Sequence, residues 1–225
     1  MTKEVYIVIV AGGKGKRMGI DIPKQFLLLN KQPVLMHTIQ QFFSYNPQHK
    51  IIVVLPHHQI KYWKELVQKH HFSVPHTIVE GGEERFFSVK NALQNITDGY
   101  VLIHDGVRPL VTHNTIAHVL QTLEEKGNAV PMLPIEDSLR QITDKGTQSV
   151  DRNYFRAVQT PQGFVSQEIK EAYGQEFSKA FTDDASVYEA WGGIIHETIG
   201  NKENIRITTQ EDILLTNYYI KSILQ

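Results

Sequence analysis

The sequence predicts a doubly wound α/β fold, a mostly parallel sheet with helices on both faces. Apolar, β-branched runs such as residues 5–10 and 51–55 are continuous rather than alternating, which is typical of strands buried on both faces. Helical patterns separate these runs along the chain. The 225 residues suffice for one substantial core without disulfide or metal support.

The expected elements alternate as a parallel sheet requires. In the first helix, Leu35, Ile39, Phe42 and Phe43 fall on one face, the spacing of an amphipathic helix. Strands are expected at residues 5–10, 51–55, 77–79, 101–103 and 129–132, with helices at 34–43, 60–67, 86–93 and 115–125.

The alternation stops at about residues 136–156, which we expect to form a protruding arm. Residues 138–142 and 148–150 are polar strand-like segments on either side of an Asp-Lys-Gly turn, which predicts a β-hairpin. An isolated hairpin is barely stable in water, so this arm should pack against something outside the core. A second copy of the chain is the simplest candidate, so the hairpin is expected to be a dimerisation arm.

Helices return after the arm, at residues 167–173 and 185–191. A final helix should begin at Thr208, where a capping-box pattern ends in Glu211, and run to about Leu224. No linker, repeat or low-complexity stretch divides the sequence. We therefore expect residues 1–225 to form a single domain that carries the arm.

Composition excludes several classes of function. Lysine and arginine total 23 against 24 acidic residues, for a net charge of −1, which argues against a nucleic-acid-binding protein. The absence of cysteine removes disulfides, thiolate nucleophiles and cysteine-ligated metals. The 11 histidines show no metal-ligand spacing and are expected on the solvated surface. Neither a membrane span nor a signal peptide is evident, so we expect a cytoplasmic protein.

A glycine-rich basic loop follows the first strand. Gly12, Gly13 and Gly15 leave room for backbone N–H groups to surround an anion. Between residues 14 and 24 there are four cations and one acid, a local charge of +3. The loop stands at the carboxyl end of the first strand, where α/β sheets bind ligands. It therefore predicts a phosphate-binding site.

The loop matches neither of two better-known phosphate-binding motifs. A P-loop needs Ser or Thr after its Gly-Lys pair, and here Arg17 follows Gly15 and Lys16. A dinucleotide-binding loop needs a third glycine at the position that Met18 occupies. Neither a standard NTPase nor a nicotinamide enzyme is favoured.

The loop, followed by Pro23-Lys24-Gln25, resembles the nucleotide-binding signature of nucleotidyltransferases that activate sugars and polyols. Further motifs appear in the order typical of the 2-C-methyl-D-erythritol 4-phosphate cytidylyltransferases of isoprenoid precursor synthesis, and the resemblance covers nearly the whole chain. These motifs are Gly81–Arg85 with Ser88, His104–Pro109, Val150–Asn153, Thr160–Gln162, Thr182–Ser186, Asn204–Thr208 and Glu211-Asp212.

The resemblance implies a Rossmann-like nucleotidyltransferase that joins a phosphomonoester, 2-C-methyl-D-erythritol 4-phosphate, to the α-phosphate of CTP and releases pyrophosphate. A phosphomonoester has a second pKa of about 6, so its attacking oxygen is already anionic at neutral pH. Such a reaction needs two polyanions held in line and positive charge at the reacting phosphorus. The cations of the loop suit this chemistry.

By resemblance, four residues are expected to be catalytic: Arg17 and Lys24 stabilise the transition state, and Arg152 and Arg206 bind the phosphate of the second substrate. CTP is expected to contact Ala11, Gly12, Gly13, Gly15, Gly82, Ser88 and Asp105. The polyol phosphate is expected to contact Asp105, Arg108, Ser138, Arg152, Thr160, Thr182 and Arg206.

The resemblance also implies a cofactor and a partner. Mg²⁺ or another divalent cation is expected mainly on the CTP phosphates, with Asp105 as the one candidate protein ligand. Arg152 lies on the arm, which in the family reaches into the neighbouring subunit's site, so a homodimer with a shared site is expected. Two positions depart from the family pattern: Arg206 stands where lysine is common, and Ser138 where threonine is usual. Arginine keeps the charge of lysine but offers a fork of donors.

Alternatives remain at two levels. Ser88 could be an exposed serine on a helix, and Asp105 a cap for the following turn. A ribitol-5-phosphate cytidylyltransferase for wall polymers would share the glycine loop and the 160–162 motif, but residues 150–153 and 183–186 favour the methylerythritol enzymes. A non-catalytic nucleotide sensor would have no reason to keep Arg17, Lys24 and Arg152.

Overall fold

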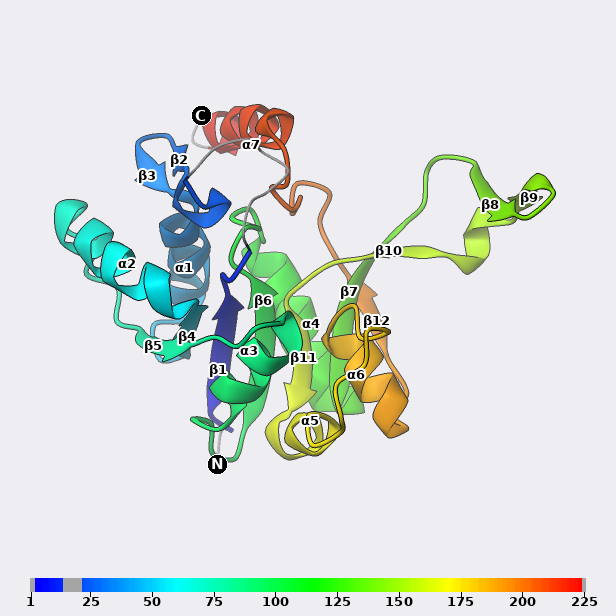
Figure 1. The fold of residues 1–225 in the computed structure, drawn as a ribbon, viewed down its shortest axis with the longest axis horizontal. Coiled ribbons are helices and arrows are strands. Elements are labelled where there is room, and N and C mark those ends of the chain that lie inside the picture. Colours follow the sequence, from blue (N-terminus) through cyan, green and yellow to red (C-terminus); the bar gives the residue numbers. More distant parts are fainter. Residues whose placement is uncertain (1–2, 14–21, 224–225) are drawn as a thin grey trace.

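A computed structural model describes residues 3–13 and 22–223, and side chains as far as residue 220. Its central sheet has the strand order β10-β7-β11-β6-β1-β4-β5, with β12 paired to β7 (Figure 1). The strands are β1 (Val5–Val10), β4 (Lys50–Leu55), β5 (Thr77–Glu80), β6 (Tyr100–Asp105), β7 (Asn128–Pro134), β10 (Arg156–Val158), β11 (Gln162–Val165) and β12 (Glu197–Ile199).

The first four of these strands, β1, β4, β5 and β6, form a parallel half-sheet, as predicted. Beside it, β11 runs antiparallel to both β6 and β7, and β10 runs antiparallel to β7. The strands β10, β11 and β12 were not expected, because their three or four residues do not form the continuous apolar, β-branched run that predicted the other strands. The mostly parallel, doubly wound class is confirmed.

Helices cover both faces of the sheet. They are α1 (Val34–Tyr45), α2 (His57–Lys69), α3 (Arg85–Leu93), α4 (His113–Lys126), α5 (Ser166–Ala172), α6 (Asp184–Trp191) and α7 (Gln210–Ile223). Ile7 and Ile9 belong to the core cluster beneath α1, α2 and α4, whereas Tyr6 and Val8 belong to the cluster beneath α3, α5 and α6. Successive residues of β1 are thus buried on opposite faces, which explains why its apolar run is continuous.

A separate hairpin of β8 (Leu139–Thr143) and β9 (Gly146–Val150) extends away from the body of the molecule (Figure 1). Gly146 closes its turn with φ of 119°, a conformation that favours glycine. Ile142 on β8 is 84% exposed. The hairpin lies where the sequence predicted it, and a short 3₁₀ helix, Arg152–Tyr154, follows it.

The last helix, α7, lies over a small sheet of β2 (Leu28–Leu29) and β3 (Gln32–Pro33). Its cap is one residue later than predicted. Thr209 N donates to the Asp212 carboxylate and Asp212 N donates to Thr209 Oγ1, so the reciprocal pair is Thr209 with Asp212, not Thr208 with Glu211. Among the described residues, none of the helices has the length and apolarity that crossing a membrane requires.

Candidate active site

Two adjoining cavities lie at the carboxyl edge of the parallel strands. The first, about 390 Å³, is bordered by the segment after β1, by Lys24 and by the start of α3. The second, about 220 Å³, is bordered by residues between β10 and β11 and by the segment before α6. Arg85, Asp105 and Arg206 line both cavities and form the wall between them. A larger cavity of about 630 Å³ lies at the opposite edge, beside the amino ends of β1, β4 and β5.

The floor of the first cavity is the backbone that leaves β1. The fully buried Gln25 holds it, because its Nε2 donates to Ala11 O at 2.7 Å and to Gln59 Oε1 at 2.6 Å. A Cβ on Gly13 would stand 3.1 Å from Lys24 Cε, so the lysine side chain passes directly over this glycine. Lys24, Ala11, Gly12 and Gly13 therefore meet as predicted. Gly15 and Arg17 lie outside the described residues.

The opposite side of the first cavity is the segment before α3. Ser88 is only 4% exposed, so the interpretation of an exposed serine is wrong. Its Oγ accepts a hydrogen bond from Gly82 N at 3.1 Å. A Cβ on Gly81 would lie 2.8 Å from that oxygen, and one on Gly82 would lie 2.4 Å from Phe87 Cβ. Both glycines thus let the segment lie close against α3.

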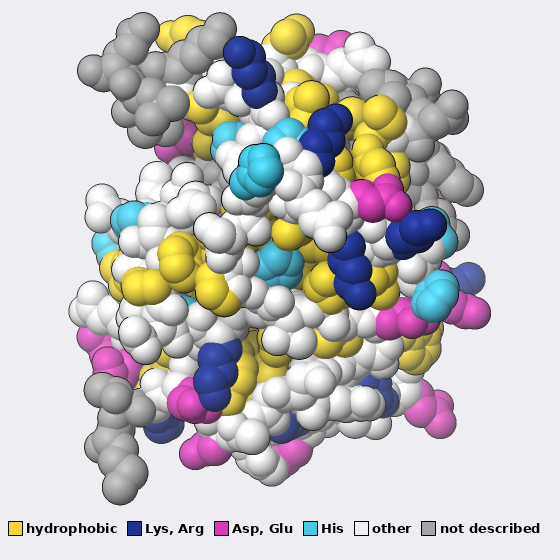
Figure 2. Space-filling view, turned by 90° about the vertical axis from the view of Figure 1, so that its left-hand side faces the viewer, with side chains coloured by type: hydrophobic (Ala, Val, Ile, Leu, Met, Phe, Trp, Pro, Cys, Tyr) yellow, Lys and Arg dark blue, Asp and Glu magenta, His cyan; other side chains and the backbone are white. Residues whose placement is uncertain are grey.

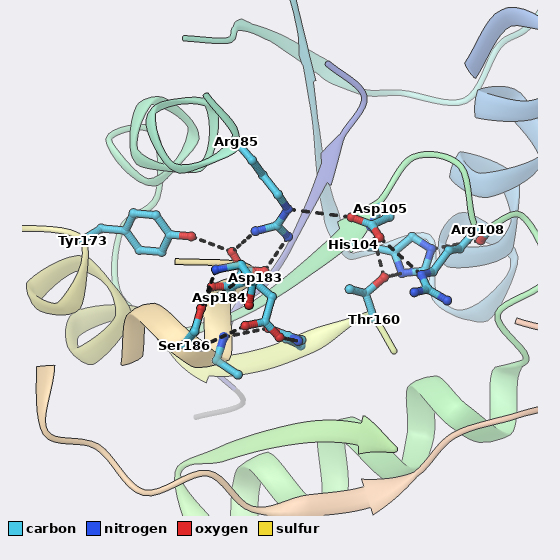
Figure 3. Close-up of polar contacts among 12 residues, drawn as sticks. Arg85, His104, Asp105, Arg108, Thr160, Tyr173, Asp183, Asp184 and Ser186 are labelled. Atoms are coloured by element: carbon cyan, nitrogen blue, oxygen red, sulfur yellow. Dashed lines mark hydrogen bonds and ion pairs between the residues drawn. The ribbon is translucent and has the colours of Figure 1, made fainter. Parts of the chain in front are cut away.

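Asp105 stands in the shared wall among three guanidinium groups, of which Figure 3 shows those of Arg85 and Arg108. Its carboxylate oxygens lie 3.3 Å from Arg108 Nε, 3.8 Å from Arg85 Nε and 3.9 Å from Arg206 Nη1. Burial raises the pKa of Asp105, but the three positive charges outweigh burial and lower the pKa below its ordinary value. Asp105 is therefore an ionised acceptor, and its main contacts are with these arginines rather than with a capped turn.

Arg85 is a site residue to which the sequence assigned no role. Its Nη1 and Nη2 donate to the two carboxylate oxygens of Asp184 at 2.7 and 2.6 Å. Asp184 is fully buried and also accepts from Tyr173 Oη at 2.6 Å. Burial opposes the charge of Arg85, but Asp184 outweighs burial and raises the pKa of the guanidinium. The forked contact fixes Arg85 in the wall.

The charge of the shared wall is positive. Arg85 and Arg206 supply two positive charges against the one negative charge of Asp105, which leaves +1. The described residues contain no cluster of three or more His, Cys, Asp or Glu side chains that could hold a metal ion. The wall therefore suits an anion.

The second cavity brings together Arg108, Thr160, Thr182 and Arg206, as predicted. Arg108 Nη1 donates to Asn204 O at 2.7 Å, which ties the loop after β6 to the segment that carries Arg206. Thr182 directly precedes the α6 cap, in which Ser186 N donates to Asp183 Oδ1 at 2.9 Å.

The sequence predicted that the histidines lie on the solvated surface, and for His104 this prediction is wrong. Figure 2 views the side of the molecule that carries α2, where histidine side chains appear at the surface. His57 and His58 at the start of α2 are exposed, but His104 in β6 is fully buried beside Thr160. Burial lowers the pKa of His104 to about 4, so its ring is neutral near pH 7.

Ser138 and Arg152 line neither cavity. Ser138 is exposed just before β8, and Arg152 is exposed in the 3₁₀ helix after the hairpin, where its guanidinium contacts Glu136 O. A single chain therefore brings together the predicted site residues of its core and leaves those of the arm apart. The assignment of Arg152 to a partner's site, and of Ser138 to the polyol phosphate, stays a prediction.

Comparison with known proteins gives a consistent result. A family model described as "IspD: 2-C-methyl-D-erythritol 4-phosphate cytidylyltransferase" matches residues 5–222. A protein of that name from Bacteroides thetaiotaomicron is 49% identical over 208 residues, covering 92% of this chain and 95% of the relative. One from Porphyromonas gingivalis is 46% identical over 224 residues, covering 99% of this chain and 100% of the relative.

Solved structures agree with these relatives. The 4-diphosphocytidyl-2C-methyl-D-erythritol synthase from Anaerococcus prevotii superposes with a TM-score of 0.82 at 26% identity, covering 97% of this chain and 96% of that one. The bifunctional IspDF from Campylobacter jejuni gives a TM-score of 0.81 at 28% identity, covering 94% of this chain and 54% of that one.

Proposed function

The chain belongs to the 2-C-methyl-D-erythritol 4-phosphate cytidylyltransferase family, and from this premise we propose which of its residues serve each substrate. The protein is a nucleotidyltransferase of isoprenoid precursor biosynthesis by the methylerythritol phosphate pathway. It transfers the cytidylyl group of CTP to 2-C-methyl-D-erythritol 4-phosphate, which yields 4-diphosphocytidyl-2-C-methyl-D-erythritol and pyrophosphate. The division of residues below rests on the two cavities.

The first cavity binds CTP. The backbone N–H groups of residues 11–13, together with Gly15, surround the triphosphate, because glycines let backbone approach an anion closely. Gly82, Ser88 and Asp105 contact the nucleoside. Lys24 and Arg17 stabilise the charge that develops at the α-phosphate and on the leaving pyrophosphate. The position of Lys24 across Gly13 supports this assignment.

The second cavity binds the polyol phosphate, through Asp105, Arg108, Thr160, Thr182 and Arg206. The observation that carries the proposal is the shared wall of Arg85, Asp105 and Arg206. A wall common to two anion sites lets the ends of two substrates meet, and positive charge at that meeting point lowers their mutual repulsion.

The reaction follows from this arrangement. An anionic phosphate oxygen of the polyol phosphate attacks the α-phosphorus of CTP and forms a new P–O bond. The bond between the α-phosphorus and the bridging oxygen to the β-phosphate breaks, and pyrophosphate carries away the electron pair. Since the nucleophile is already ionised, the protein supplies alignment and positive charge rather than a general base.

A divalent cation is compatible with the residues present. Mg²⁺ typically uses one or two carboxylates together with substrate phosphates and keeps several waters, so a cage of protein ligands is not required. Asp105 in the shared wall is a hard oxygen donor of the right class. We propose that Mg²⁺ binds mainly through the CTP phosphates, with Asp105 as its candidate protein ligand. When bound, the ion neutralises phosphate charge.

Arg152 and Ser138 act in the site of a second copy, which makes the working protein a homodimer joined through the arm. Both residues are exposed and both flank a hairpin that extends away from the core (Figure 1). An extended hairpin is poorly stable alone, which favours a partner for it. Both substrates are small soluble metabolites, which suits the proposed cytoplasmic location.

Substrate assays test this function. The purified protein is incubated with CTP and Mg²⁺ and with either 2-C-methyl-D-erythritol 4-phosphate or ribitol 5-phosphate, and pyrophosphate release is measured. Faster release with the methylerythritol substrate is expected. Faster release with ribitol 5-phosphate would favour the wall-polymer enzyme, and CTP binding without release in either reaction would favour a nucleotide sensor.

A further inference from the structure

His104 lies behind Thr160, which lines the second cavity, and it has no task in the reaction described above. Its ring is fully buried at the end of β6 and packs edge-on against Phe42, with ring centroids 4.9 Å apart. Nε2 lies 3.0 Å from the carbonyl oxygen of Arg108. Nδ1 lies 3.0 Å from Thr160 Oγ1 (Figure 3).

These partners fix the position of the proton on His104. A carbonyl oxygen only accepts hydrogen bonds, so Nε2 carries the hydrogen. The ring is fully buried against Phe42, and its two nitrogens contact a carbonyl and a hydroxyl, both uncharged, which favours the neutral ring. Nδ1 therefore bears only a lone pair, and the hydroxyl of Thr160 must donate to it.

The hydroxyl of Thr160 consequently has one lone pair, and no hydrogen, left for a further hydrogen bond. A threonine hydroxyl has one hydrogen and two lone pairs. The hydrogen is used by His104, and one lone pair accepts from Asp105 N at 3.1 Å. Within the described part of the chain, the structure gives this oxygen no third partner. Thr160 lines the second cavity and can meet a ligand there only as an acceptor.

We propose that His104 is a positioning residue that turns Thr160 into a hydrogen-bond acceptor for a hydroxyl group of the polyol, not a donor to its phosphate. The proposal rests on the function assigned above. A phosphate anion presents lone pairs and would be repelled by the free lone pair of Thr160, whereas a polyol hydroxyl can donate to it. Asp105, an acceptor too, lines the same cavity.

This arrangement orients the second substrate. In the second cavity, Thr160 and Asp105 present hydrogen-bond acceptors. The guanidinium of Arg206, whose side chain is 47% exposed, presents donors. Hydroxyl groups bind toward the first set and the phosphate toward the second. Thr160 thereby becomes a specificity-determining residue for polyol phosphates.

The first test compares enzyme variants with substrate analogues. Thr160→Val removes the hydroxyl at nearly constant volume, and three analogues of 2-C-methyl-D-erythritol 4-phosphate each lack the hydroxyl at carbon 1, 2 or 3. Wild-type turnover of the complete substrate is measured first, since its failure would refute the function and not this proposal. One analogue should lower wild-type kcat/KM by about threefold to tenfold, the effect of one neutral hydrogen bond.

With Thr160→Val, the same analogue should react as well as the complete substrate, because the contact is already lost. The matched control Thr160→Ser keeps the hydroxyl and should keep the wild-type discrimination. The proposal would be overturned if, for all three analogues, the loss of kcat/KM from Thr160→Val and the loss from the missing substrate hydroxyl simply multiply. The hydroxyl of Thr160 would then contact none of the three substrate hydroxyls.

The second test separates the two contacts of His104. His104→Asn keeps an oxygen acceptor near the position of Nδ1, and His104→Gln keeps a donor near Nε2 but offers Thr160 no matching acceptor. His104→Asn should keep the discrimination among analogues. His104→Gln should lose it and raise KM for the polyol phosphate, with KM for CTP unchanged. Equal loss in both variants would show that His104 only supports the fold.

Discussion

At the scale of single residues, the negative charge of Asp105 depends on the arginines around it. It is held by Arg85, Arg108 and Arg206, which come from α3, the loop after β6 and the segment before α7. A buried carboxylate without such partners would be neutral rather than charged. The three arginines therefore keep a negative acceptor inside a site that otherwise binds polyanions.

Lys24 offers a direct test of transition-state stabilisation. Lys24→Ala should lower kcat by at least roughly a hundredfold, the effect of losing one preorganised electrostatic group. Lys64→Ala, a change at an exposed position of α2, serves as the matched control and should leave kcat unchanged. Pyrophosphate release under saturating substrates measures both. Normal turnover by Lys24→Ala would refute its role.

Arg206 tests the departure from the family pattern. Arg206→Lys restores the usual residue and keeps the charge, so KM for the polyol phosphate should change by less than about threefold. Arg206→Met removes the charge and should raise that KM by about tenfold to a hundredfold, the range for a charged hydrogen bond. Steady-state kinetics with each variant distinguish the two. Equal effects would mean that the charge of residue 206 is not what binds the substrate.

His104 makes a pH-dependent contribution to stability. Its folded pKa of about 4 lies below its ordinary 6.5, so below pH 6.5 the unfolded chain binds a proton that the folded chain does not. Stability should therefore fall as the pH drops from 6.5 to 4, by up to roughly 3 kcal/mol from this group. His104→Asn should reduce that dependence, measured by urea unfolding at pH 7 and pH 4.5. An unchanged dependence would contradict this assignment.

The separation of partners along the chain decides which residues the sequence could reveal. Lys24, Ser88 and Asp105 belong to short motifs whose spacing is visible directly. Arg85 binds Asp184, 99 positions away, and His104 binds Thr160, 56 positions away. Those pairs lie within known motifs, but only the folded chain shows that they touch.

At the scale of elements, Trp63 packs α2 into the core of the molecule. This side chain is fully buried and its Nε1 donates to His76 Nε2 at 3.0 Å. The same ring stacks on Phe26, with centroids 6.1 Å apart, in the 3₁₀ helix that also carries Lys24. Packing of α2 therefore supports one side of the first cavity.

Trp63→Ala should lower the free energy of unfolding by about 3–5 kcal/mol, because it leaves a large cavity in the core. Trp191→Ala, at a position that is 38% exposed, is the matched control and should cost less. Urea unfolding followed by circular dichroism measures both. Equal losses would contradict the contribution of Trp63 to the core.

Length and burial also decide which elements were predictable. The strands β1, β4 and β6 are each six residues long and contain at least four consecutive apolar residues, and the sequence located all of them. The three-residue β10 and β12 contain no such apolar run. They form strands because they pair with β7. The α7 cap was misplaced because Thr208 and Thr209 are both suitable and both contact Asp212, and only the hydrogen bond that Asp212 N donates to Thr209 Oγ1 distinguishes them.

At the scale of the whole molecule, charge is distributed unevenly. The net charge is −1, yet the wall between the two cavities carries +1 from Arg85, Asp105 and Arg206. The sequence could predict a concentration of positive charge around residues 14–24, but not the arginine wall, whose members come from distant segments. A near-neutral chain can thus bind two polyanions at one edge of its sheet.

Mixing inactive variants tests whether the site is shared between two chains. Lys24→Ala and Arg152→Ala should each be nearly inactive alone. If subunits exchange, half of the dimers in an equal mixture are mixed and each has one intact site, so about a quarter of wild-type activity should return. Exchange is verified by mass spectrometry of the mixed dimers. No recovery despite exchange would place Arg152 outside the partner's site.

The extended hairpin affects how the rate of product synthesis depends on the concentration of the protein. If each site is completed by another chain, the fraction of working sites depends on association as well as on the number of chains. Near the dissociation constant of the dimer, halving expression would more than halve flux. An arm that reaches outward would in this way make the rate of synthesis steeper than linear in gene dosage.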